Sequence, residues 1–197
     1  RLECGQLDQA AELVVRLRRL STESGLDLWS LVGATENATV KALQALAAGS
    51  EAGTLGERAE RLARRVDGSR HMQLNSYLTF HDAVIGRLLI AAGRHYDARQ
   101  RLQISLRHAA ETGMHFHDAE LLRLLAQTSP DPKERRDGLN AALDLARSQG
   151  ATLFEVRCLL DLFEAGDGQV RSELRDALGR LGDSRWPEHA QARLVLA

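Results

Sequence analysis

The sequence is short of several residue types, and each shortage narrows the possible fold. Aromatic residues make up 4% of the 197 positions, and the whole chain contains three prolines. Runs of strand-forming Val, Ile, Tyr and Thr are few, whereas Leu and Ala are abundant, so the composition favours helices. The two cysteines, Cys4 and Cys158, lie far apart and form no CxxC pair. This excludes a disulfide scaffold and is typical of a reduced, cytoplasmic protein.

An excess of charge of one sign is also absent. The chain has 26 Lys and Arg against 27 Asp and Glu, a formal net charge of −1. Nucleic-acid-binding segments usually carry a basic excess, so we expect no direct contact with DNA or RNA. No apolar run approaches the roughly 18 residues of a membrane span, so we expect no membrane contact. The chain begins at Arg1 without a signal-peptide pattern, and we expect it to be a fragment of a longer polypeptide.

Hydrophobic residues, which make up 44% of the chain, recur at the spacing of amphipathic helices. The pattern predicts about nine or ten helices. They are expected to form helix pairs at roughly residues 6–49, 56–92, 94–128, 132–165 and 168–196. The stretch GSEAGTLGE, residues 49–57, is predicted to be a loop.

Glycines punctuate these segments at a regular interval. Gly25, Gly68, Gly113 and Gly150 are separated by 43, 45 and 37 residues, and each is predicted to end a helix. Because each interval holds two helices, the period is that of a stacked helical repeat. The sequence therefore predicts an all-α fold, a right-handed α-solenoid of antiparallel helix pairs, in a single helical-repeat domain over residues 1–197.

The segment ETGMHFHDAELLRLLAQTSPDP, residues 111–132, allows two interpretations. In the first, His115, His117 and Glu120 contribute to a metal site. However, zinc binding from a helix prefers spacings of three or four residues, and only His117 and Glu120 have that spacing. In the second, one helix ends and the next begins here, with Phe116 buried in the stack. We favour this helix junction.

A helix start is predicted directly after this segment. Asp131 can accept from the free N–H groups, Pro132 fits the first helical position, and Glu134 can complete a capping box.

Known catalytic signatures are missing from the sequence. GxxxxGK[ST], GxGxxG and GxSxG do not occur. Cys158 lies beside a predicted core stripe and is not expected to act as a nucleophile. No catalytic, metal-binding or cofactor-binding residue is predicted, and we expect this segment not to be an enzyme.

Four stretches resemble segments of known families. GRHYDARQRL at Gly93 and GQLDQAAELV at Gly5 are similar to the G-x-x-x-x-A opening of a tetratricopeptide helix. HDAELLRLLAQTSPDP followed by ALDLARSQGATLFEVRCLLDL resembles the C-terminal helical-repeat region of large MalT-like, LuxR-type ATPase regulators of actinobacterial type, which are also found joined to adenylate cyclase domains. The resemblance covers about residues 90–165. The nucleotide loop and the helix-turn-helix of that family have no counterpart here.

This resemblance implies a tetratricopeptide-like (TPR-like) module of a cytoplasmic transcriptional regulator. We expect it to bind a protein partner or a second copy of itself, and to pass that signal to an ATPase elsewhere in the parent chain. Trp29 and Trp186 are single aromatic residues that could anchor a partner. Trp186 precedes Pro187 and equally fits a hydrophobic staple.

The alternative is a receptor for a small-molecule inducer, since MalT-like repeats sense a sugar-type inducer. A pocket requires apolar walls and a few convergent polar groups. His71, Tyr77 and His81 are predicted to lie near one another along one helix and to supply those groups.

Overall fold

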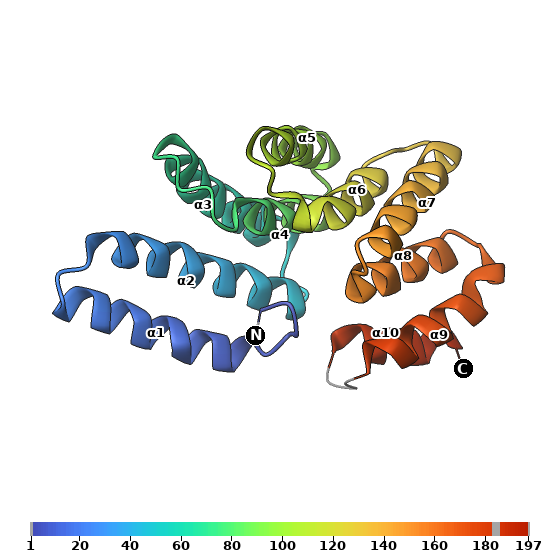
Figure 1. Ribbon diagram of the computed structural model, residues 1–197, viewed down its shortest axis with the longest axis horizontal. Coiled ribbons are helices and arrows are strands. Elements are labelled where there is room, and N and C mark those ends of the chain that lie inside the picture. Colours follow the sequence, from blue (N-terminus) through green and yellow to red (C-terminus); the bar gives the residue numbers. More distant parts are fainter. Residues whose placement is uncertain (1, 183–185, 197) are drawn as a thin grey trace. The chain divides into compact units, whose positions relative to one another are not determined.

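The computed structural model describes residues 2–182 and 186–196, and these form helices without any strand. The α-helices are α1 (Leu7–Glu23), α2 (Asp27–Ala47), α3 (Ala52–His71), α4 (Leu78–Ala91), α5 (His95–Thr112), α6 (Asp118–Gln127), α7 (Pro132–Ser148), α8 (Thr152–Glu164), α9 (Arg171–Leu181) and α10 (Pro187–Leu196) (Figure 1). Two single turns of 3-10 helix, η1 (His115–His117) and η2 (Gly168–Val170), precede α6 and α9. The all-α prediction is confirmed.

The chain divides into two compact units, Arg1–Arg101 and Leu102–Ala197, and the boundary falls within α5. Two helices occupy each of the five ranges predicted from the hydrophobic spacing, with α3 starting four residues before the predicted position 56. A single helical-repeat domain and its right-handed solenoid remain predictions.

The first unit is built on α2, which contacts α1, α3 and α4. The helices α1 and α2 run antiparallel (Figure 1). Ala10 and Val14 on α1 pack against Val40 of α2. A larger core joins α2, α3 and α4, with Leu43, Leu62 and Leu88 among its buried members. The stripes of Leu and Ala that the sequence places at helical spacing thus form the interfaces.

The second unit contains a continuous core from α6 to α10. Leu139, Leu159 and Leu174, from α7, α8 and α9, are completely buried in it. Gly138 allows α6 and α7 to approach closely, because a Cβ atom at that position would lie 2.9 Å from the Cβ of Ala126.

Left-handed residues end most helices of both units. At the end of α1 Gly25 has φ +65°, its N–H donates to the Thr22 carbonyl, and the Leu26 N–H donates to the Ser21 carbonyl. This is the Schellman arrangement, which satisfies carbonyls that the helix leaves unpaired. The predicted helix ends at Gly25, Gly113 and Gly150 are confirmed.

The predicted helix end at Gly68 is wrong, because α3 continues through Gly68 to His71. Gln73 takes the left-handed conformation instead, with φ 58°, and the Leu74 N–H donates to the Ser69 carbonyl. A glutamine gives no sequence signal for this role, since left-handed backbone favours glycine.

The loop predicted for residues 49–57 is correct for residues 49–51 and wrong for residues 52–57, which belong to α3. Only Ala48 to Glu51 separate α2 from α3, and Gly53 and Gly56 lie within α3. Neither glycine has a positive φ. A Cβ atom on Gly53 would meet nothing within 4 Å, so the helix simply tolerates the missing side chain there.

The junction predicted for residues 111–132 is confirmed, but with a different residue buried. Helix α5 ends at Thr112 and α6 begins at Asp118. Phe116 is 44% exposed, whereas His117 is 8% exposed and its ring lies 5.5 Å from that of Phe154. The 3-10 turn between the two helices rotates the chain, so helical spacing does not identify the buried side chain.

The start of α7 follows the prediction in part. The Asp131 carboxylate accepts from the Lys133 N–H, and Pro132 occupies the first helical position. The Glu134 carboxylate accepts from the Ser129 hydroxyl, and that hydroxyl oxygen accepts from the Asp131 N–H.

Glycine inside a helix and glycine with a positive φ predict opposite effects of an alanine substitution on the free energy of unfolding. Gly68→Ala should stabilise the protein by about 0.5–1 kcal/mol, because alanine is the better residue inside an exposed helix turn. Gly113→Ala should destabilise it by about 1 kcal/mol, because Gly113 has φ +74°. Urea unfolding measures both. A loss of stability in Gly68→Ala would contradict the continuous α3.

Candidate functional site

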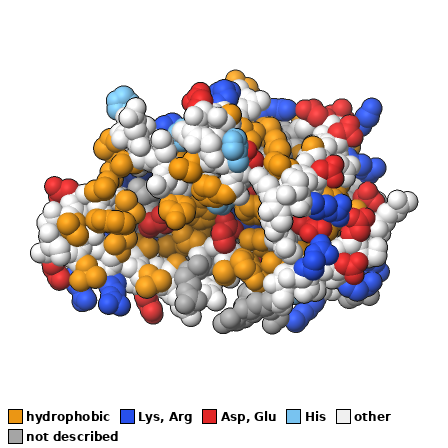
Figure 2. Space-filling model, in the orientation of Figure 1, with side chains coloured by type: hydrophobic (Ala, Val, Ile, Leu, Met, Phe, Trp, Pro, Cys, Tyr) orange, Lys and Arg blue, Asp and Glu red, His pale blue; other side chains and the backbone are white. Residues whose placement is uncertain are grey.

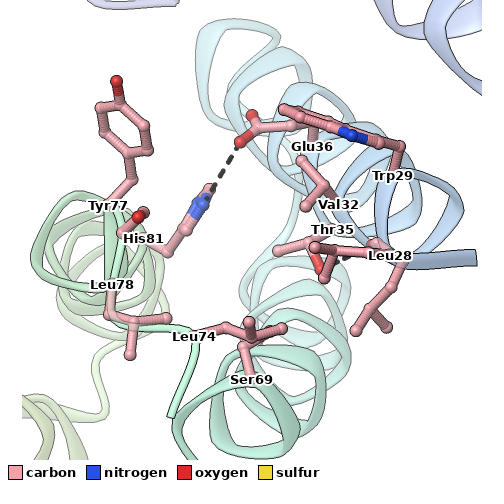
Figure 3. A pocket seen from close by; sticks show the side chains of 12 residues that line it. Leu28, Trp29, Val32, Thr35, Glu36, Ser69, Leu74, Tyr77, Leu78 and His81 are labelled. Atoms are coloured by element: carbon pink, nitrogen blue, oxygen red, sulfur yellow. Dashed lines mark hydrogen bonds and ion pairs between the residues drawn. The ribbon is translucent and has the colours of Figure 1, made fainter. Parts of the chain in front are cut away.

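A pocket of about 270 Å³ opens in the first unit between α2, the end of α3 and the start of α4 (Figure 3). Its rim carries three exposed side chains, Leu28, Trp29 and Tyr77. The remaining apolar wall consists of Leu31, Val32, Leu74 and Leu78. The volume lies just below the range of about 300–1,000 Å³ that is typical of ligand pockets, so the pocket suits a small molecule.

The polar groups of the pocket converge on His81, which is 4% exposed. Its Nδ1 lies 3.1 Å from the Thr39 hydroxyl, and its Nε2 lies 3.4 Å from a carboxylate oxygen of Glu36. In Figure 3 the His81 ring and the Glu36 carboxylate point toward one another from α4 and α2. Two helices therefore contribute to one polar group of side chains.

The Thr39 hydroxyl constrains the protons on His81. That hydroxyl also lies 3.0 Å from the Thr35 carbonyl, to which it can donate its single proton. If it does, the Nδ1–H of His81 donates to Thr39. If Thr39 instead donates to Nδ1, a neutral ring carries its proton on Nε2. The second arrangement directs the Nε2–H toward Glu36.

The loop between α3 and α4 lines the same pocket and has unusual backbone geometry. Gln73 and Tyr77 are the residues other than glycine with positive φ in the described ranges, at 58° and 62°. Between them, Leu74 and Ser76 line the pocket. Residues held in this conformation cost free energy and cluster at functional sites.

The structure brings together two of the three residues predicted to line a groove. Tyr77 and His81 line the pocket, whereas His71 is exposed and does not. The prediction that all three lie along one helix is wrong, because His71 ends α3, Tyr77 precedes α4 and His81 lies within α4. Figure 3 shows the Tyr77 hydroxyl directed away from His81. That these residues bind a ligand stays a prediction.

Sequence analysis missed the contribution of α2 to this site. Leu28, Trp29 and Glu36 reach the pocket from a helix more than 40 residues before His81. Their spacing of one and eight residues places them on one side of α2, which is a weak signal. Only the pairing of α2 with α4 brings that side to His81.

A buried ion cluster lies elsewhere in the first unit. Asp82 is completely buried, with one oxygen 2.5 Å from Arg70 and the other 2.6 Å from Arg101. Asp67 accepts from the same two arginines at 2.8 and 2.6 Å. The cluster joins α3, α4 and the first turns of α5. Its carboxylates are committed to arginines, so it is a structural element rather than an acid–base pair.

The second unit has a comparable cluster. Glu120 accepts two hydrogen bonds from Arg123 and one from Arg157, and Arg157 also reaches Glu188 at 2.7 Å. Burial lowers the pKa of Arg123, but the carboxylates of Glu120 and Asp161 outweigh it and hold that pKa well above its usual value. The cluster ties α6, α8 and α10 together.

Cys158 lies within this second core. Burial raises the pKa of its thiol to about 12, although Arg123 and Arg157 lower it in part. The thiolate is the reactive form, so a thiol with this pKa is inert at neutral pH. The geometry agrees with the expectation that Cys158 is not a nucleophile.

Three further observations concern the remaining candidates. In the part of the chain that the structure describes, no three His, Cys, Asp or Glu side chains gather where they could hold a metal ion. His115 instead pairs with Asp118 at 2.8 Å. Across residues 2–182 and 186–196, no helix combines the length with the apolar character that a membrane crossing requires.

Comparison with known proteins gives no relative. No protein-family model, no curated protein and no solved structure matches the chain. The similarity to MalT-like regulators therefore stays a prediction.

The ion cluster of the first unit makes a prediction for stability. Asp82→Asn should destabilise the protein by about 3 kcal/mol, because Arg70 and Arg101 keep their charges and lose a buried partner. The control is Glu60→Gln, which removes an exposed pair between Glu60 and Arg94 and should cost less than about 1 kcal/mol. Denaturant unfolding gives both values. Equal losses would show that Asp82 has no special role.

The buried thiol makes a prediction for reactivity. Iodoacetamide at mildly alkaline pH should modify the partly exposed Cys4 and leave Cys158 unmodified until the protein unfolds, because burial opposes thiolate formation. Mass spectrometry of peptides from native and urea-treated protein distinguishes the two sites. Modification of Cys158 in native protein as fast as that of Cys4 would contradict the buried position.

Proposed function

We propose that this chain is a non-enzymatic protein-interaction and signal-sensing module. Its helix pairs form a TPR-like, right-handed solenoid, and it belongs to a cytoplasmic transcriptional regulator of the MalT-like, LuxR type. It passes partner binding or self-association to an ATPase module elsewhere in the parent chain. The resemblance over residues 90–165 supports the type of regulator.

The observation that supports an interaction surface is an apolar patch on α1 and the start of α2. The patch consists of five exposed side chains: Leu13, Leu20, Leu26, Leu28 and Trp29. Figure 2 shows hydrophobic side chains gathered over the part of the surface where Figure 1 places these two helices. Exposed apolar side chains gathered on neighbouring helices are typical of interaction sites.

The arrangement on α1 explains the patch. Val14 and Ala10 face α2, while Leu13 and Leu20, seven residues apart, lie on the adjacent side of the helix and are about half exposed. A helix that rests on one neighbour needs one apolar stripe. The second stripe on α1 favours an additional partner.

The partner that we propose is a second copy of this chain. A formal net charge of −1 gives two copies almost no mutual repulsion, so charge does not oppose contact between their apolar patches. Tryptophan is enriched among the residues that contribute most to binding at interfaces, so Trp29 is the expected anchor of this contact.

The proposed non-enzymatic character is supported by three of the buried ionisable groups. Asp82 and Glu120 are bound by arginines, and Cys158 is an inert thiol. None of these groups faces the pocket in the first unit.

Self-association is tested by analytical ultracentrifugation of the 197-residue chain. The wild type should sediment faster as its concentration rises, and the double variant Leu13→Asp, Leu20→Asp should remain a monomer because the charges oppose burial of the patch. The control is Leu194→Asp on α10, a leucine that lies outside the patch and is 85% exposed, against 52% for Leu13 and 45% for Leu20. A wild type that stays monomeric at every concentration would contradict the proposed partner.

A second candidate function is favoured by the pocket between α2 and α4. Apolar walls, a few converging polar groups and a loop with two left-handed residues are typical of a small-molecule effector site. Leu28 and Trp29 belong both to the pocket rim and to the apolar patch. A ligand at this site would therefore alter the surface that we propose for self-association.

A further inference from the structure

The charge of the α2–α4 pocket restricts the ligands that it can hold. Among its twelve lining residues Glu36 is the only Asp, Glu, Lys or Arg. The Glu36 side chain is 24% exposed, and within residues 2–182 and 186–196 the basic side chain that approaches it is His81, at 3.4 Å. A carboxylate accepts several hydrogen bonds, so Glu36 can bind a further donor from inside the pocket.

One aromatic side chain lines the pocket from the same helix as Glu36. Trp29 is about half exposed at the rim and lies seven residues, or two helical turns, before Glu36 on α2. The face of an indole ring attracts cations more strongly than that of any other side chain. Trp29 and Glu36 therefore favour the same kind of ligand group.

Other ligand classes fit these residues less well. An anion would meet Glu36 without any Lys or Arg in the lining. A fully apolar molecule would bury Glu36 beside apolar atoms without a new partner, which is unfavourable. A sugar needs many hydrogen-bonding groups, whereas Leu28, Val32, Leu74 and Leu78 offer none from their side chains.

We propose that this pocket binds a small organic ammonium ion with an apolar body. The ammonium group donates to the Glu36 carboxylate beside the Trp29 ring, and the apolar body lies against Val32, Leu74 and Leu78. This assignment rests on the second candidate function, the effector receptor, and adds the chemical class of its ligand.

Isothermal titration calorimetry of the whole 197-residue chain near neutral pH tests the assignment with three probes of equal chain length. These are hexylammonium, hexanol and hexanoate. Hexylammonium should bind about tenfold more tightly than hexanol, since a partly exposed ion pair and a cation–π contact each add a modest preference. Hexanoate should bind most weakly.

Three variants separate the parts of the proposal. Glu36→Gln should remove the preference for hexylammonium over hexanol, and Glu57→Gln, an exposed carboxylate on α3 outside the pocket, should leave it unchanged. Ser76→Trp, at an exposed position of the lining, should weaken the binding of hexylammonium and hexanol alike by obstructing the pocket. Circular dichroism establishes that each variant is folded. If Glu36→Gln fails to fold, Trp29→Leu at the exposed rim should reduce the same preference.

The outcomes distinguish the ligand class from the receptor function. If hexylammonium and hexanol bind equally and Glu36→Gln changes neither affinity, the ligand is not an ammonium ion, but the proposed receptor function stands. Tightest binding of hexanoate leads to the same conclusion. The absence of binding by all three probes overturns both the ammonium class and the receptor function. Binding that Ser76→Trp does not change places the probes elsewhere and overturns the assignment to this pocket.

Discussion

Burial of one Leu- and Ala-rich stripe per helix is the interaction on which the rest of the structure depends. Leu62 and Leu88 in the first unit and Leu139 and Leu159 in the second are completely buried between helices. Each such side chain contributes about 1.5–3 kcal/mol when it leaves water. Aromatic residues are scarce, and many buried positions hold small residues such as Ala142. These small side chains allow the helix backbones of each unit to approach closely, so that the apolar stripes of neighbouring helices are in contact.

The buried ion clusters have a different role. Taking Asp82 or Glu120 out of water costs free energy that their arginines roughly recover, so such clusters add little net stability to a helix pair. They do make one arrangement of helices much better than others, because a shifted helix would leave a charge unpaired. In the first unit Asp82 and Asp67 fix α3, α4 and the start of α5, and the apolar stripes then determine how tightly these helices pack.

Much of the helix arrangement could be predicted from the sequence, because hydrophobic spacing and helix-ending glycines are local signals. The ends at Gly25 and Gly150 and the start at Pro132 are examples. The errors arose where a local signal has two physical causes. Gly68 lies inside α3, although glycine often ends a helix. Gln73 adopts the left-handed conformation, although glycine is the residue expected there. His117 is buried in place of Phe116 because a 3-10 turn changes the helical spacing.

The candidate site was harder to predict from the sequence, because its residues come from segments that are far apart along the chain. His81 stands out on an apolar stripe, but its neighbours Glu36 and Trp29 become significant only when α2 packs beside α4. The pocket exists because α3 runs on to His71 and α4 starts only at Leu78, so the loop between them, rather than a continuous helix, faces α2.

The central claim is that the packed amphipathic helices of the first unit form the α2–α4 pocket, through which a ligand acts on the apolar patch. Methyl-resolved NMR of the chain with added hexylammonium tests this most directly. The account predicts that the shifted methyl signals belong to Leu28, Val32, Leu74 and Leu78. Shifts at methyl groups of the second unit, such as those of Leu139 and Leu174, with the pocket signals unchanged, would contradict it.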